Sequence, residues 1–125
     1  PSDLISLVAA AGDADRYRRQ VAANLLREAD PAIAATEWSR LVADPAGAVR
    51  RAAVDAMVDA GREELRPLLE SALGDPDAWV RWKALRGLVE LGPEPSREAV
   101  AVCAGDADFR VRLEAAGALR ALAGS

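Results

Sequence analysis

Apolar residues recur at intervals of three and four along the chain, a spacing that places them on one face of an α-helix. Between residues 77 and 91 this stripe consists of Val80, Ala84, Leu88 and Leu91, with Leu85 beside it. Charged residues occupy five of the ten remaining positions of this segment. The pattern therefore predicts an amphipathic helix over 77–91, and similar stripes predict further helices before and after it.

Residues typical of helix ends border these stripes. Asp75-Pro76-Asp77 predicts an N-cap, a proline at the first helical position and an acid near the positive end of the helix dipole. Asp44-Pro45 repeats the arrangement, and Asp30-Pro31 is expected to open another helix in the same way. Gly61 and Gly92 are predicted to end helices, because glycine is favoured just after the last helical turn.

An internal repeat organises the chain. Four aspartates lie 31 residues apart: Asp13, Asp44, Asp75 and Asp106. The sixth residue after each of them is an arginine: Arg19, Arg50, Arg81 and Arg112. The fifth is valine except in the first repeat, where it is Arg18, and the ninth is always alanine. A period of this length indicates stacked supersecondary units.

Each repeat is predicted to contain two antiparallel helices, so that residues 1–125 form a single all-α domain with repeats over about 1–29, 30–60, 61–91 and 92–125. We expect the first helices to form an outer, convex layer over 2–11, 31–43, 62–73 and 96–104. The second helices should form an inner, concave layer over 15–29, 46–60, 77–91 and 108–122. One pair cannot bury its apolar face alone, so the repeats must stack, here as a right-handed α-α superhelix.

With these positions in place, the chain resembles the HEAT-like repeat proteins, in particular the short repeats of phycobilisome lyases and of artificial consensus scaffolds. The segment DPDAWVRWKALRGLVELG, residues 75–92, is similar to the second-helix pattern of that family, and weaker copies cover about 2–123. The resemblance implies an α-solenoid. It also implies that the repeated aspartates and arginines form a structural ladder of hydrogen bonds and ion pairs between adjacent repeats.

Several residues depart from the family pattern. Arg18 replaces the valine, Leu25 replaces a small residue, and Glu37 falls where a core leucine is expected. Neither end of the chain has an obvious polar cap. Two explanations stay open: the ends pair with another copy of the chain, or further repeats belong to a longer protein.

Composition narrows the candidate functions. The net charge of −4 argues against nonspecific nucleic-acid binding, which needs an excess of Lys and Arg. The chain has no histidine and one cysteine, Cys103, so it lacks the usual zinc ligands and any internal disulfide. No apolar run approaches the length of a membrane span. We expect a soluble cytoplasmic protein with no cofactor, no metal and no catalytic residue.

Candidate binding residues occupy positions of the second helices that lie off the core stripe. Trp79 and Trp82 stand out in a chain with few aromatic residues, whereas Trp38 and Cys103 match core positions of the first helices. The two tryptophans either cover neighbouring alanines or, with nearby arginines, form a binding hot spot, and we favour the hot spot. The predicted partner-binding residues are Tyr17, Arg51, Asp55, Trp79, Trp82, Lys83, Arg86, Glu90, Phe109 and Arg110.

The sequence thus predicts a noncatalytic module that binds a peptide or protein on its concave face. All the candidate groove positions together carry five positive and five negative residues, a balance that suits a protein partner better than a polyanion. The positive ones are Arg16, Arg51, Lys83, Arg86 and Arg110, and the negative ones are Glu28, Asp55, Asp59, Glu90 and Glu114. The alternative is a HEAT-like lyase subunit or a protein that acts on DNA bases, as the resemblance to families with those activities suggests.

Overall fold

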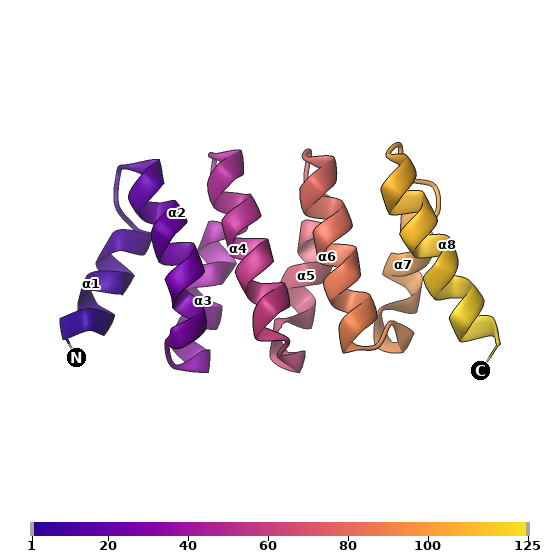
Figure 1. Ribbon diagram of the computed structural model, residues 1–125, viewed down its shortest axis with the longest axis horizontal. Coiled ribbons are helices and arrows are strands. Elements are labelled where there is room, and N and C mark those ends of the chain that lie inside the picture. The colour runs from indigo at the N-terminus through magenta and orange to yellow at the C-terminus, as the bar shows by residue number, and fades with distance from the viewer. Residues whose placement is uncertain (1, 125) are drawn as a thin grey trace. The chain divides into compact units, whose positions relative to one another are not determined.

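The computed structural model describes residues 2–124, with side chains from residue 4 onward, and this part of the chain contains helices and turns but no strand. The α-helices are α1 (Ser2–Ala11), α2 (Arg16–Leu25), α3 (Pro31–Leu41), α4 (Gly47–Ala60), α5 (Arg66–Ala72), α6 (Ala78–Leu91), α7 (Arg97–Cys103) and α8 (Phe109–Ala123). Three short 3₁₀ turns adjoin them: η1 (Leu26–Glu28), η2 (Glu63–Leu65) and η3 (Glu94–Ser96). The predicted all-α fold of helix pairs is confirmed (Figure 1).

Most of the predicted helices are shorter in the structure than the sequence pattern indicates; α3, for example, ends at Leu41 rather than at residue 43. The helix expected over 15–29 ends at Leu25 and continues as η1. The first helices of the last two repeats begin as the 3₁₀ turns η2 and η3 before α5 and α7. Pro67 lies in the first turn of α5, where its missing amide hydrogen costs no helical hydrogen bond.

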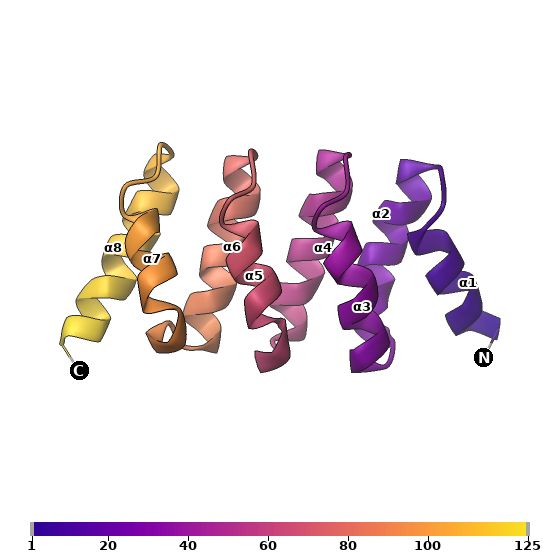
Figure 2. The ribbon, with the colours of Figure 1, turned by 180° about the vertical axis from the view of Figure 1, so that it is seen from behind.

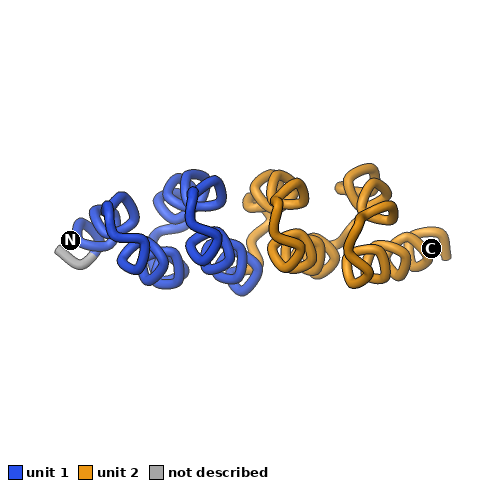
Figure 3. Tube along the Cα trace, turned by 90° about the horizontal axis from the view of Figure 1, so that it is seen from above, with its two compact units in different colours: residues 1–60 blue, residues 61–125 orange. Residues whose placement is uncertain are grey.

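The chain divides into two compact units, residues 1–60 and 61–125, each with two helix pairs (Figure 3). In unit 1, α2 and α4 pack side by side, and α1 and α3 form a second layer that is in front in the view from behind (Figure 2). In unit 2, α6 packs beside α8, while α5 packs on α6 and α7 packs on α8. The boundary between the units coincides with a predicted repeat boundary; the single domain stays a prediction.

The repeated small and branched residues form the core of each unit. The four alanines at the ninth position, Ala22, Ala53, Ala84 and Ala115, are each at most 1% exposed. The valines at the fifth position, Val49, Val80 and Val111, are fully buried. Alanine at a helix contact lets two backbones approach closely, and the neighbouring valines fill the remaining space. The periodic alanines and valines therefore form the contacts between packed helices in each unit.

The repeated aspartates shape the turn between the two helices of each pair. An oxygen of Asp13, Asp44, Asp75 and Asp106 accepts a hydrogen bond from the backbone N–H two residues later, at 2.7–2.9 Å. This is the local bond by which aspartate stabilises a tight turn. The same carboxylate is thereby held in a fixed position for a second partner.

The repeated arginines hold their own turn and reach the next one. Arg81 Nη1 donates to the carbonyl oxygens of Asp75 and Pro76, at 2.8 and 3.2 Å, and its Nε and Nη2 donate to both oxygens of Asp106, at 2.9 and 3.0 Å. In unit 1, Arg19 makes the equivalent two-bond contact with Asp44. We call this arrangement the arginine clamp. It joins adjacent repeats within each unit through a paired, charge-assisted contact.

The expected role of Asp75 as an N-cap is wrong. Helix α6 begins at Ala78, and Asp77 caps it by accepting a hydrogen bond from Trp79 N at 2.9 Å. Asp75 instead accepts from the backbone of Asp77, which places Pro76 in the turn rather than at the first helical position. Helix α4 likewise begins after Pro45, at Gly47, whereas Asp30 does cap α3 as expected.

Three other expectations concern single buried residues. Trp38 is fully buried, as predicted, and its indole N–H donates to the carbonyl of Ala23 at 2.9 Å. Cys103 is also buried, at 4% exposed. Glu37, the departure from the apolar pattern, is buried as well, and its carboxylate accepts a hydrogen bond from Arg40. A carboxylate at this core position is tolerated because a guanidinium supplies the partner.

Replacing Arg81 with alanine is expected to destabilise unit 2. The change leaves the Asp106 carboxylate, whose side chain is 12% exposed, without its guanidinium, and it also frees two turn carbonyls. We expect a loss of about 2 kcal/mol in the free energy of unfolding, measured by urea titration. Arg97→Ala, which removes an exposed pair with Glu94 in the same unit, is the control and should change little. Equal losses would contradict the clamp.

The clamp also predicts a specific response to acid. The hydrogen bond from Arg81 holds the pKa of Asp106 below its usual value, against an opposing effect of burial. A carboxyl with a lowered folded-state pKa contributes stability above its unfolded-state pKa, and this stability disappears as the pH falls through the folded-state pKa. Between about pH 4 and pH 2, the wild type should lose more unfolding free energy than Arg81→Ala. Parallel urea titrations across this range would contradict the prediction.

Candidate functional site in unit 2

Seven of the ten predicted binding residues lie on two neighbouring helices of unit 2. Helix α6 carries Trp79, Trp82, Lys83, Arg86 and Glu90, and α8 carries Phe109 and Arg110. Because α6 and α8 pack side by side, we call the surface formed by these two helices the α6–α8 face. Tyr17, Arg51 and Asp55 belong to unit 1, and their grouping with these residues stays a prediction.

The two tryptophans are half-buried and adjacent. Their ring centroids are 6.5 Å apart with planes tilted by 59°, a favourable arrangement for an aromatic pair. Trp82 packs against the buried cluster of unit 2 that includes Leu85 and Val111, so part of the ring is anchored in the core. The remainder of the ring faces a pocket. Trp82 therefore has a structural contact with the core, as one of the two interpretations expects, and its role in a binding hot spot stays a prediction.

Two guanidinium groups lie over the indole of Trp82. The Cζ atoms of Arg86 and Arg110 are each 5.6 Å from its ring centroid, within the range of a cation–π interaction. Arg86 also lies 3.9 Å from Glu90, and Arg110 lies 3.6 Å from Asp108. Both ion pairs are long, and the Arg86 and Arg110 side chains are 45% and 54% exposed, so both guanidiniums keep donor capacity for a further partner.

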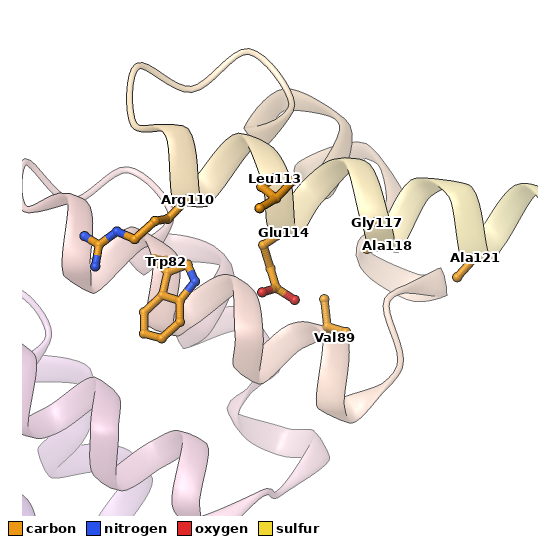
Figure 4. A pocket seen from close by; sticks show the side chains of 8 residues that line it. All are labelled: Trp82, Val89, Arg110, Leu113, Glu114, Gly117, Ala118 and Ala121. Atoms are coloured by element: carbon orange, nitrogen blue, oxygen red, sulfur yellow. The ribbon is translucent and has the colours of Figure 1, made fainter.

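A pocket of about 410 Å³ lies beside Trp82, between α6 and α8 (Figure 4). Its lining residues are Trp82, Val89, Arg110, Leu113, Glu114, Gly117, Ala118 and Ala121. In the view of Figure 4, Glu114 extends from α8 toward α6, and Arg110 extends past the indole of Trp82. The pocket thus combines a mainly apolar lining with one positive and one negative side chain.

Most of the pocket lining was not among the predicted site residues, although the sequence carries a signal for it. Gly117 and Ala121 of the fourth repeat correspond to Asn24 and Glu28 of the first repeat, and earlier repeats carry polar residues at both positions. Leu113 likewise occupies a position that is glutamine in the first repeat. The loss of polar side chains in this one repeat creates an apolar hollow that an average repeat pattern conceals.

Phe109 and Tyr17, the other two aromatic residues of the predicted site, do not line this pocket. Phe109 is 64% exposed, and its ring is 5.7 Å from Cζ of Arg112, but it is not part of the lining. Tyr17, in unit 1, is also 64% exposed and has Cζ of Arg16 at 5.2 Å from its ring. Both rings are accessible on the surface of their own unit.

Among the described residues there is neither a cluster of metal ligands nor an activated cysteine. These residues contain no group of three or more acidic, cysteine or histidine residues placed to hold a metal ion. Burial raises the pKa of the Cys103 thiol, which keeps it protonated and weakly nucleophilic. No helix among the described residues combines the length and the apolar character that a membrane span needs.

Comparison with known proteins agrees with this geometry. The family model for HEAT repeats matches residues 35–120, more than half of the chain. The chain belongs to the HEAT repeat family. No curated protein sequence matches it significantly. HEAT repeats commonly mediate protein–protein interaction, and their all-α fold is typically a non-enzymatic scaffold.

Substituting Gly117 with alanine is expected to stabilise this HEAT repeat protein. Gly117 lies inside α8, and an added Cβ would meet no atom closer than the flexible Arg120 Nη2 at 4.0 Å. Glycine inside a helix costs about 0.5–1 kcal/mol relative to alanine, so unfolding free energy should rise by about that amount. Urea titration measures it. A loss of stability would show that the pocket must stay open for α8 to pack.

Proposed function

We propose that this chain is a noncatalytic protein interaction module that binds a peptide segment or protein surface on the α6–α8 face. The observation that carries the proposal is the pocket beside Trp82, with Arg86 and Arg110 over the indole. Tryptophan and arginine are the residue types most enriched among binding hot spots. The membership in the HEAT repeat family supports a protein partner in general.

The size and lining of the pocket favour a side chain as its occupant. A volume of about 410 Å³ lies in the lower part of the range of ligand sites and accommodates a large apolar side chain. Trp82 is held on the core of unit 2, so little conformational entropy is lost when a partner contacts it. A partner would bury Leu113, which is 58% exposed in the described structure.

The charges around the pocket favour a protein over a nucleic acid. Arg110 and Glu114 both line it, so a phosphate backbone would meet a carboxylate as well as a guanidinium. The net charge of −4 adds a general repulsion for polyanions. A polypeptide with mixed polar and apolar groups can satisfy both charges while its apolar side chain enters the pocket.

A single substitution on the pocket wall should test this function. Peptides selected from a random displayed library against the wild type should lose about tenfold or more in affinity for Leu113→Glu, which places a charge where the apolar side chain binds. Fluorescence anisotropy of labelled peptides gives the affinities. In addition, occupation of the pocket should shift the emission of Trp82.

Val102→Glu is the matched control, because Val102 is also exposed, at 78%, but lies on α7 outside the pocket. Peptides that bind both variants as tightly as the wild type would place the binding site elsewhere. Duplex DNA at low salt and a free bilin, added to the wild type, test the two alternative functions through a salt-dependent affinity and a shifted absorption band.

A further inference from the structure

The first and the last repeat of the described chain carry complementary halves of the arginine clamp. Inside each unit, the arginine of one repeat donates two hydrogen bonds to the aspartate of the next, as Arg19 does to Asp44 and Arg81 does to Asp106. The first described repeat has the aspartate of this contact, Asp13, and the last has the arginine, Arg112. Each of them lacks the matching repeat within the described chain.

Arg112 is already oriented for the missing contact. Its Nη1 donates to the carbonyls of Asp106 and Ala107, at 2.8 and 2.9 Å, in the same way that Arg81 Nη1 holds its own turn. In Arg81, this hold directs Nε and Nη2 to the next aspartate. In Arg112, Nε and Nη2 have no acceptor among the described residues, so a preformed donor pair is available.

Asp13 is the corresponding acceptor. Its Oδ1 accepts from Asp15 N at 2.7 Å, which fixes the turn as in the other repeats. Its Oδ2 has one side-chain partner, Arg18, at 3.4 Å, and the Arg18 side chain is 71% exposed. This contact is weaker than the bidentate pair that Asp44 receives from Arg19.

The surface beside Asp13 is apolar and matches buried positions of a later repeat. We call it the leading face and define it by Asp13, Val21 and Leu25. Val21 and Leu25 are 57% and 51% exposed, whereas the equivalent Ala52 and Ala56 of the second repeat are 8% and 0% exposed, since α4 packs on α2. A hollow lined in part by Val21, Leu25 and Leu7 lies on this face.

The surface beside Arg112 also exposes residues whose equivalents are buried, in this case residues equivalent to those of the first repeat that pack against the second repeat. We call it the trailing face and define it by Arg112, Ala116 and Leu119. Ala116 and Leu119 are partly exposed, whereas the equivalent Ala23 and Leu26 of the first repeat are fully buried beneath the second repeat. Each face therefore exposes the residue types that the interior of unit 1 uses to join two repeats.

We propose that the trailing face of one copy of this chain binds the leading face of a second copy, with Arg112 donating to Asp13 as Arg19 donates to Asp44. A second copy is favoured over an unrelated partner because it supplies both the arginine and the apolar neighbours at the repeat spacing that the other face requires. This surface is separate from the α6–α8 pocket and does not depend on the proposed function.

The contact is head-to-tail, so it uses different surfaces on the two copies and can continue beyond a dimer. Arg18 opposes this contact, because its guanidinium forms an ion pair with Asp13 and adds a positive charge where Arg112 must approach. The interface should therefore be weak in the wild type. The repeat pattern supplies the corrective change, since the equivalent residues Val49, Val80 and Val111 are apolar and buried.

Sedimentation velocity over a wide concentration range tests the proposal. The wild type should show a mass that rises with concentration, Arg18→Val should associate more tightly, and Leu25→Glu and Arg112→Gln should each weaken association by about tenfold or more. Val102→Glu, a more exposed apolar residue outside both faces, should behave as the wild type. A wild type that stays monomeric at the highest accessible concentration overturns the proposal.

Mixing two variants tests the head-to-tail geometry. Leu25→Glu retains an intact trailing face and Arg112→Gln retains an intact leading face, so an equimolar mixture should form a one-to-one dimer that grows no further. Association of Arg112→Gln alone at wild-type strength would indicate a symmetric contact between leading faces and overturn the model of stacking. Ala116→Glu is the second trailing-face variant, and circular dichroism verifies that each variant remains helical.

Discussion

The arginine clamp is the interaction on which the arrangement of repeats within each unit depends. One guanidinium holds the carbonyls that end its own turn and reaches the carboxylate that shapes the next turn, as Arg81 does between Asp75 and Asp106. Because the aspartate is fixed by a backbone N–H, the arginine meets a preoriented acceptor. A polar contact therefore sets the register between repeats, while the apolar residues supply most of the free energy of packing.

The clamp explains why small residues dominate the helices it joins. Once the turns are tied together, the second helices of neighbouring repeats must lie close, and α2 and α4 do so with Ala52 and Ala56 buried at their contact. Larger side chains there would separate the helices and lengthen the distance from arginine to aspartate. Leu25 is tolerated at the equivalent position because it remains 51% exposed, whereas Ala56 is fully buried.

Much of the fold could be predicted because the same residue types recur at equivalent positions in successive repeats. The alanines, the valines and Trp38 are buried as expected. The N-cap of α6 was misplaced because two aspartates surround Pro76, and sequence cannot say which of them caps the helix and which closes the turn. The pocket was missed for a related reason: it arises from Leu113, Gly117 and Ala121, where the last repeat departs from its own pattern.

In this HEAT repeat protein, the residues that hold the repeats together differ from the residues of the proposed binding site. Residues that obey the repeat inside a unit, such as Arg81 and Asp106, are engaged with each other and have little capacity for a ligand. Residues that depart from the repeat leave surface that no neighbouring side chain covers. Trp82 is large where the other repeats carry glutamine, arginine or leucine. Gly117 is small where the other repeats carry polar side chains. A large ring beside an absent side chain makes a hollow with a rigid wall. The residues of the proposed binding site are therefore found by comparing each repeat of the chain with the other repeats.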